Sequence, residues 1–210
     1  KYPEKARNIN VSVSYVLSIP DQASIKIRSV SGSVEASDIG GLFEVNNTSG
    51  GVTLSRMGGG VDCMVVSGGI KVTDVKGDVE LKTVSGSIGA ARILGSIDAE
   101  TTSGSIVLSE IVEPKTVRVK VLSGKIDYDG GIAAGGKYSF ESLSGSVRVT
   151  VPSSSGFDLE AETFSGSINT DFPITMQGKI DRKSIHGVVN NGGAALRIKA
   201  FSGSIEIRKR

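Results

Sequence analysis

The dipeptide Ser-Gly recurs along this chain at regular intervals that strongly constrain its fold. In the first half the interval is 18 residues, with copies at Ser31, Ser49, Ser67, Ser85 and Ser103. It then lengthens to 20 or 21 residues, with copies at Ser123, Ser144 and Ser165; His186-Gly187 takes the next equivalent position and Ser202-Gly203 closes the series. A fixed period of this length indicates a repeat architecture in which each repeat stacks on its neighbours.

Glycine also recurs every nine residues from Gly32 to Gly104, so each 18-residue repeat contains two arcs that end at a glycine corner. An offset of 18 residues aligns apolar residues in columns, which are Val34, Val52, Ile70, Ile88 and Ile106; Phe43, Val61, Val79 and Ile97; and Ile39, Met57, Val75, Ile93 and Ile111. Within an arc the apolar residues alternate as in a half-buried strand. The sequence therefore predicts an all-β fold, a single-stranded parallel β-helix (β-solenoid) of about ten turns of 18–21 residues. The general crossover preference of parallel strands predicts a right-handed coil.

A column of charges supports the same alignment of the turns. Asp38, Arg56, Asp74, Arg92 and Glu110 alternate in sign at the 18-residue offset, so in a parallel stack each charge would lie between opposite charges. We expect one domain over residues 1–210, with leading and capping strands at 11–30 and regular turns at 31–112. Longer turns with loops would follow at 113–201 and a C-terminal cap at 202–210.

The flanks and insertions of the repeat predict caps and loops. Residues Val11 to Ile19 alternate and end at Pro20, which is typical of an edge strand, and the basic residues that end the chain would protect the other edge. Pro- and Gly-rich insertions occur in successive long turns, around Glu113-Pro114, Gly130 to Gly136, Pro152 to Gly156, and Phe172 to Gly178. We expect these insertions to form loops along one edge of the solenoid, either as a binding edge or as simple elongations of the turns.

Composition argues against several functional classes. The formal charge of +2, from 24 basic and 22 acidic residues, gives no strong attraction to nucleic acid or to anionic membranes. A single cysteine excludes an intrachain disulfide, and no stretch approaches the roughly 18 apolar residues of a membrane helix. We expect no membrane insertion, and Lys1 is interpreted as a mature or trimmed end from which an export signal has been removed.

The chain resembles a bacterial adhesin family of domains of unknown function, whose members are β-solenoids. The resemblance rests on the Val-Ser-Gly-Ser-Val and Thr-Val-Ser-Gly-Ser-Ile units at 30–34 and 83–88, on segments 162–168 and 192–196, and on the terminal unit at 201–205. It covers residues 11–210 and implies an exported protein at the cell surface, in the periplasm or lipid-anchored at the envelope. It implies no catalytic residues, and His186 departs from the Ser-Gly pattern.

Catalytic, cofactor and metal sites are not predicted. The serine ladder repeats too often to supply nucleophiles, because a catalytic residue needs one special setting, and we expect these serines to hydrogen-bond the corner backbone. His186 is the only histidine, so a Ser-His-Asp triad could form only around it, and no Gly-x-Ser-x-Gly elbow supports one. Cys63 aligns with Val45, Leu81 and Ala99 as a buried residue.

One column of like charges has two possible interpretations. Glu44, Asp62, Glu80 and Asp98 align at the 18-residue offset without a change of sign, with Lys82 beside them and Lys26 and Arg118 flanking the ends. Neighbouring carboxylates about 5 Å apart repel by roughly 1 kcal/mol even in water. The column is either a solvated acidic stripe or a weak site for a divalent cation or a basic partner.

The leading functional hypothesis is a non-catalytic, monomeric envelope or surface protein, an adhesin or binding scaffold for a protein or glycan partner. One alternative is a polysaccharide-acting enzyme, because parallel β-helices commonly host lyases and hydrolases, although Trp is absent and the turns are short for that class. Another is a self-assembling scaffold that extends through its end strands.

Overall fold

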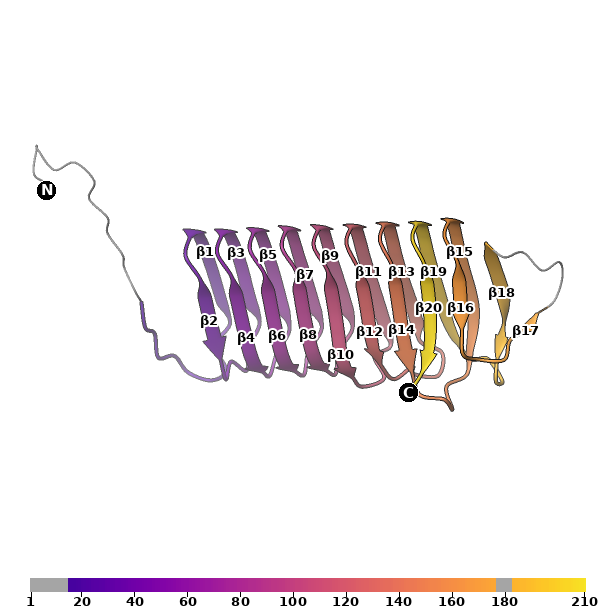
Figure 1. The fold of residues 1–210 in the computed structure, drawn as a ribbon. Helices are drawn as coiled ribbons and strands as arrows, with labels where there is room; N and C mark the ends of the chain where they lie inside the picture. The colour runs from indigo at the N-terminus through magenta and orange to yellow at the C-terminus, as the bar shows by residue number, and fades with distance from the viewer. Residues whose placement is uncertain (1–14, 177–182) are drawn as a thin grey trace, which may run out of the picture.

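A computed structural model describes residues 15–176 and 183–210, which form an all-β solenoid of two facing sheets (Figure 1). The larger sheet has 11 strands in the order β1 (Ile25–Ser31), β3 (Phe43–Ser49), β5 (Val61–Ser67), β7 (Val79–Ser85), β9 (Ile97–Ser103), β11 (Thr116–Ser123), β13 (Lys137–Ser144), β19 (Ala194–Ser202), β15 (Phe157–Ser165), β18 (Ser184–Val189) and β17 (Thr175–Met176). The smaller sheet has 9 strands in the order β16 (Ile168–Thr170), β20 (Ile205–Lys209), β14 (Val147–Val151), β12 (Ile126–Gly130), β10 (Ile106–Ile111), β8 (Ile88–Ile93), β6 (Ile70–Val75), β4 (Val52–Met57) and β2 (Val34–Ser37).

The predicted parallel register is confirmed. Val34 pairs with Val52, Val52 with Ile70, and Ile70 with Ile88, and the same 18-residue offset joins Phe43 to Val61 in the larger sheet. The apolar columns of both sheets point inward and form one buried core. Each turn therefore contributes one strand to each sheet, and the 9 strands of the smaller sheet correspond to somewhat fewer turns than the ten predicted.

The Ser-Gly dipeptide forms the corner at which the chain passes from the larger to the smaller sheet. Gly104 has φ of +142°, and a Cβ atom there would lie 2.0 Å from the carbonyl oxygen of Gly86 in the turn below. No side chain can occupy this position without moving the backbone of the neighbouring turn. The repeat thus places glycine where corners of successive turns touch.

The corner hydrogen bonds come from different residues than predicted. The serines that precede the corner glycines are exposed and make no side-chain hydrogen bond within the described residues. Buried side chains two positions earlier bind the corner instead: Thr83 Oγ1 donates to Gly68 O at 3.0 Å and Thr101 Oγ1 donates to Gly86 O at 3.0 Å. These hydroxyls lie inside the turn and reach the carbonyl of the preceding corner, whereas the serines face solvent.

The charge column of alternating sign also forms as predicted, and it occupies a strained backbone position. Arg56 donates from Nε and Nη2 to the two carboxylate oxygens of Asp38, both at 2.6 Å. Both residues have positive φ, 54° and 62°. The hydrogen bonds from Arg56 lower the pKa of Asp38 to about 2. The offset that aligns the apolar columns thus also brings opposite charges together at the surface.

Loops at one edge of the solenoid are held by buried tyrosines. Tyr128 Oη donates to Gly131 O at 2.6 Å, and Tyr138 Oη donates to Pro114 O at 2.5 Å. The insertions around residues 113, 131 and 153 lie together beside a small cleft of about 260 Å³. The first three insertions therefore lie close together; the part of the last insertion beyond residue 176 lies outside the described residues.

The last strands are not stacked in chain order, which corrects the prediction. Strand β19 lies between β13 and β15 and pairs in parallel with both, while β20 pairs with both β14 and β16. Residues 202–210 therefore complete an interior turn and do not form a cap. The basic end residues join acidic groups there, as when Arg210 Nη1 contacts Asp129 Oδ1 at 3.0 Å.

The end of the solenoid beyond β15 is covered by the antiparallel strands β18 and β17. His186-Gly187 lies inside β18, so its predicted place at a Ser-Gly corner is wrong. Strand β18 pairs with the outer edge of β15, so the backbone groups at that edge are not left exposed.

At the opposite end, β1 is the first strand of the larger sheet. Residues 15–19 form no strand, contrary to the predicted edge strand, and Tyr15, Val16 and Leu17 are exposed. Residues 11–14 of that prediction lie outside the described residues.

Candidate functional site

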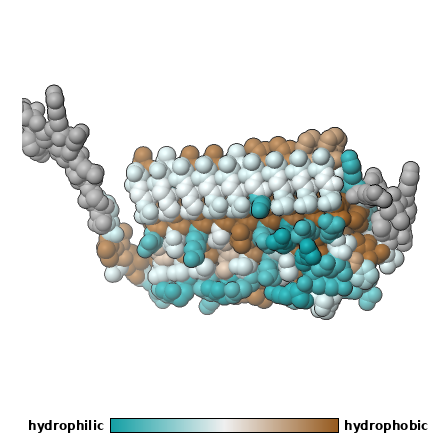
Figure 2. All heavy atoms as spheres, in the orientation of Figure 1, coloured by the Kyte–Doolittle hydropathy of each residue, from teal (hydrophilic) through white to brown (hydrophobic). Residues whose placement is uncertain are grey.

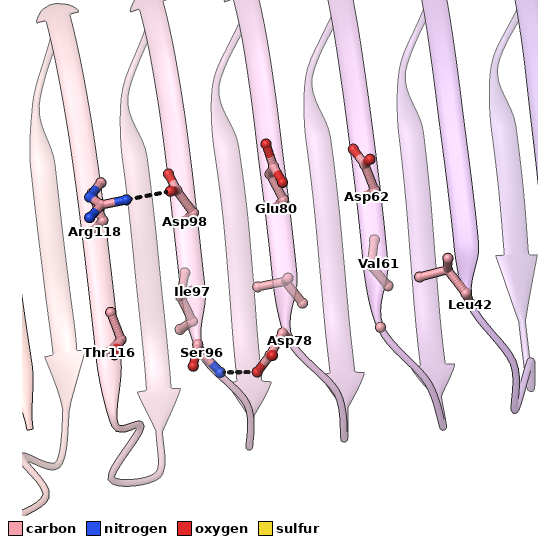
Figure 3. Close-up of a pocket in the computed structure, with 12 residues that line it drawn as sticks. Leu42, Val61, Asp62, Asp78, Glu80, Ser96, Ile97, Asp98, Thr116 and Arg118 are labelled. Carbon is pink, nitrogen blue, oxygen red and sulfur yellow. Dashed lines mark hydrogen bonds and ion pairs between the residues drawn. The ribbon is translucent and has the colours of Figure 1, made fainter.

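The acidic column lies on the outer face of the larger sheet. Glu44, Asp62, Glu80 and Asp98 occupy equivalent positions on β3, β5, β7 and β9, each in direct register with the next. Figure 3 shows Asp62, Glu80 and Asp98 side by side and extending in the same direction, with Arg118 next in the row on β11. The structure therefore brings together the carboxylates that the sequence aligned.

Cations neutralise three of the four carboxylates. Lys26 pairs with Glu44, Lys82 pairs with Glu80, and Arg118 Nη1 approaches Asp98 Oδ2 at 3.3 Å. Asp62 makes no ion pair with any described residue, although it lies between two acidic neighbours. The column thus has one unpaired negative charge near its centre.

The protonation behaviour of the column reflects this difference. Desolvation by the neighbouring strands, together with repulsion from Glu80 and Glu44, raises the pKa of the exposed Asp62 above its ordinary value. Glu44 shows the opposite behaviour, because its hydrogen bond with Lys26 lowers its pKa. An added positive group would therefore be most favourable beside Asp62, where the existing charge is least compensated.

A shallow groove of about 630 Å³ runs beside the column. Its lining includes the acidic residues Asp62, Asp78, Glu80 and Asp98, and apolar residues from the loop side such as Leu42. At its rim the backbone N–H of Ser96 donates to Asp78 Oδ1 at 2.7 Å. This arrangement suits an extended basic segment, whose cations could meet the carboxylates while its apolar atoms contact Leu42.

The column is less suitable for a bound metal ion. The described residues contain no group of three or more His, Cys, Asp or Glu side chains that could hold a metal ion together. Each carboxylate of the column is on a different strand, and strands in a sheet are about 4.8 Å apart, so the set does not converge on one point. The divalent-cation version of the hypothesis is therefore the weaker one.

His186 lies near a serine and a carboxylate, but not in the geometry of a catalytic triad. Ser184 Oγ is 2.8 Å from His186 Nε2, and Glu162 Oε1 is 3.8 Å from the same nitrogen. A triad requires the nucleophile and the carboxylate on opposite ring nitrogens. This exposed cluster on the end strands therefore lacks the relay that nucleophilic catalysis needs.

Cys63 occupies the buried position that the sequence predicted. It pairs in register with Val45 and Leu81, and its exposed fraction is 1%. Burial raises the pKa of its thiol to about 12. The thiolate, which is the reactive form, is therefore disfavoured at neutral pH.

A row of exposed apolar side chains beside the Ser-Gly corners was not predicted from the sequence. Figure 2 shows apolar colour along this upper edge, most densely over β11, β13, β19 and β15. Its largest members are Phe164 and Phe201, whose rings stack with centroids 4.9 Å apart and an interplanar angle of 4°. The alternation that turns Asp62 outward also turns the residue before each Ser-Gly outward, so the row could have been found from the sequence.

Comparison with known proteins gives a family but no characterised relative. The family model described as Toastrack DUF4097 matches residues 8–208. No curated protein and no solved structure matches the chain. Within the described residues, no helix is long and apolar enough to cross a membrane.

Proposed function

Because the chain belongs to the Toastrack DUF4097 family of domains of unknown function, its surface is the main guide to its role, and we propose that it is a non-catalytic binding scaffold of the cell envelope or cell surface. In this proposal it acts as an adhesin, and its ligand is a protein or glycan that carries basic groups. The observation that carries the proposal is the acidic column beside an open groove, with Asp62 left without a cation.

The solenoid supports this role by holding the acidic side chains at a fixed spacing. Each column residue is on a strand paired in parallel on both sides, and the inward neighbours Val45, Cys63, Leu81 and Ala99 are buried. A rigid array loses little conformational freedom when a partner binds, which favours affinity for a partner with matching spacing. The array can therefore recognise an extended ligand without any chemical step.

A binding titration tests the proposed site. The probe is a fluorescently labelled oligolysine peptide, titrated at low ionic strength with the wild-type chain and with the double variant Asp62→Asn/Glu80→Gln. Removing two central charges should weaken binding by about tenfold or more, because each unit charge in a row contributes through Coulomb attraction. Added salt should reduce the difference between the two proteins.

The matched control is the double variant Glu35→Gln/Glu113→Gln, which removes the same net charge from exposed positions outside the groove. We expect this variant to bind the peptide nearly as well as the wild type. Equal weakening by both variants would indicate a response to net charge alone and would contradict a site at the column. Depolymerisation of a glycan by the purified chain would contradict the non-catalytic role.

A further inference from the structure

The side chains of the exposed apolar row become larger along the stack, from Val84 to Phe164, and because they point away from the core, core packing does not explain this increase. We define the corner ridge as the residue before Ser-Gly on six consecutive strands of the larger sheet; in stacking order it comprises Val84, Thr102, Leu122, Leu143, Phe201 and Phe164. Their side chains face solvent, with exposed fractions of 47% for Leu122, 49% for Leu143 and 67% for Phe164. Single exposed apolar residues are common, but a row of them on neighbouring strands, interrupted here only by Thr102, indicates an interaction surface.

A column of alternating charge runs beside the ridge on the same face. It lies two residues before each ridge position and, in the same stacking order, comprises Lys82, Glu100, Lys120, Glu141, Lys199 and Glu162. Glu100, Lys120 and Glu141, at its centre, make no ion pair with described residues, although each has opposite charges on the adjacent strands. These three groups remain able to pair with a second molecule.

The order of charges makes this surface complementary to itself in one orientation. When a row of six charges that alternate in sign is turned end to end, every position then carries the opposite charge. Consider a two-fold axis that lies in the plane of this face, perpendicular to the long axis of the solenoid, and passes between β11 and β13. It would place Lys120 against Glu141 of a second copy and Glu100 against its Lys199. A parallel alignment would instead place like charges together, which is unfavourable.

The same axis matches the sizes of the ridge side chains. It places Leu122 against Leu143 of the second copy, Thr102 against its Phe201, and Val84 against its Phe164. Large side chains then meet small ones at both ends, and side chains of equal size meet at the centre. Closed symmetry of this kind requires such self-complementary patches.

We propose that the corner ridge and its charge column form the interface of an antiparallel homodimer. The sequence argument for a monomer considered only association through the end strands. The proposed interface is a sheet face and involves no strand edge. The groove beside Asp62 lies farther along the strands, toward the loops, and contributes none of these residues. The two surfaces touch only at one end, where Lys82 of the charge column pairs with Glu80 of the groove. The central dimer contacts, Lys120 and Glu141, lie outside the groove.

Sedimentation velocity over a range of concentrations tests the dimer. We expect the wild-type chain to shift from monomer to dimer as concentration rises. Lys120→Glu should weaken the dimer by about tenfold or more, since it creates two like-charge contacts. The double variant Lys120→Glu/Glu141→Lys should restore it, because the opposite charges are exchanged but still meet. A chain that stays monomeric at its highest soluble concentration, or a dimer unaffected by Lys120→Glu, would overturn the proposal.

Disulfide trapping tests the orientation. Leu122→Cys and Leu143→Cys variants are oxidised with diamide, separately and as a mixture; Cys63 is buried and does not compete. The antiparallel dimer predicts a covalent dimer in the mixture that contains one chain of each variant, and little from either variant alone. Efficient cross-linking of either variant with itself, or none in the mixture, would contradict it. Circular dichroism of each variant verifies the fold.

Discussion

Asp62 and Glu80 are direct register partners on adjacent parallel strands, yet only Glu80 has a cation, the ammonium of its neighbour Lys82. The hydrogen bond with Glu80 raises the pKa of Lys82, and no ion pair of Lys82 with Asp62 is present among the described residues. Asp62 therefore carries the excess negative charge of the column. This asymmetry explains why one carboxylate among four is the centre of the proposed site.

Asp62→Asn should stabilise the fold at neutral pH. Desolvation and acidic neighbours raise the pKa of Asp62 above its ordinary value of 3.8, so its ionised form opposes folding. The penalty is present above the folded-state pKa and disappears as the pH falls below 3.8. Allowing for screening by solvent, the gain is about 0.5–1 kcal/mol at pH 7. Urea titrations at pH 7 and near pH 3 measure it. A gain that is equally large at both pH values would contradict this explanation.

Gly104→Ala should strongly destabilise the chain. Its Cβ would lie 2.0 Å from the Gly86 carbonyl oxygen, and the φ of +142° disfavours any side chain. We expect a loss of about 3 kcal/mol or more in the free energy of unfolding. The control is Gly89→Ala, because a Cβ at Gly89 meets nothing within 4 Å. Chemical denaturation followed by circular dichroism compares the two, and similar stabilities would show that the corners tolerate side chains.

Strand β19 should exchange its amide hydrogens slowly, although it is close to the C-terminus. It pairs in parallel with β13 on one side and β15 on the other, and its inward residues Leu196 and Ile198 are buried. Hydrogen exchange monitored by mass spectrometry should show protection of residues 194–202 similar to that of β13 and greater than that of β18. Exchange of β19 as fast as that of β18 would contradict its interior position.

Periodicity predicted the register because each corner and column position repeats the same physical requirement. Gly104 must lack a side chain and Val52 must face inward, and both conditions recur every 18 residues. The acidic column and the buried Cys63 follow from the same offset, so much of the candidate site was predictable. The charge that remains on Asp62 was not, because it depends on which carboxylates nearby cations reach.

The order of the last turns could not be predicted for the same reason. Every turn presents an equivalent corner and similar apolar columns, so Ser202-Gly203 fits beside β13 as well as beyond β15. Only three-dimensional pairing distinguishes these positions, since Ser202 is in register with both Ser144 and Ser165. His186 shared the spacing of the repeat by sequence alone, while its strand is antiparallel.

Protease treatment of intact cells that express the protein, followed by immunodetection, tests most directly whether this scaffold meets partners outside the cell. We expect cleavage from intact cells while a periplasmic control protein remains whole. Full protection in intact cells, with cleavage only after the envelope is opened, would contradict surface display and the adhesive role.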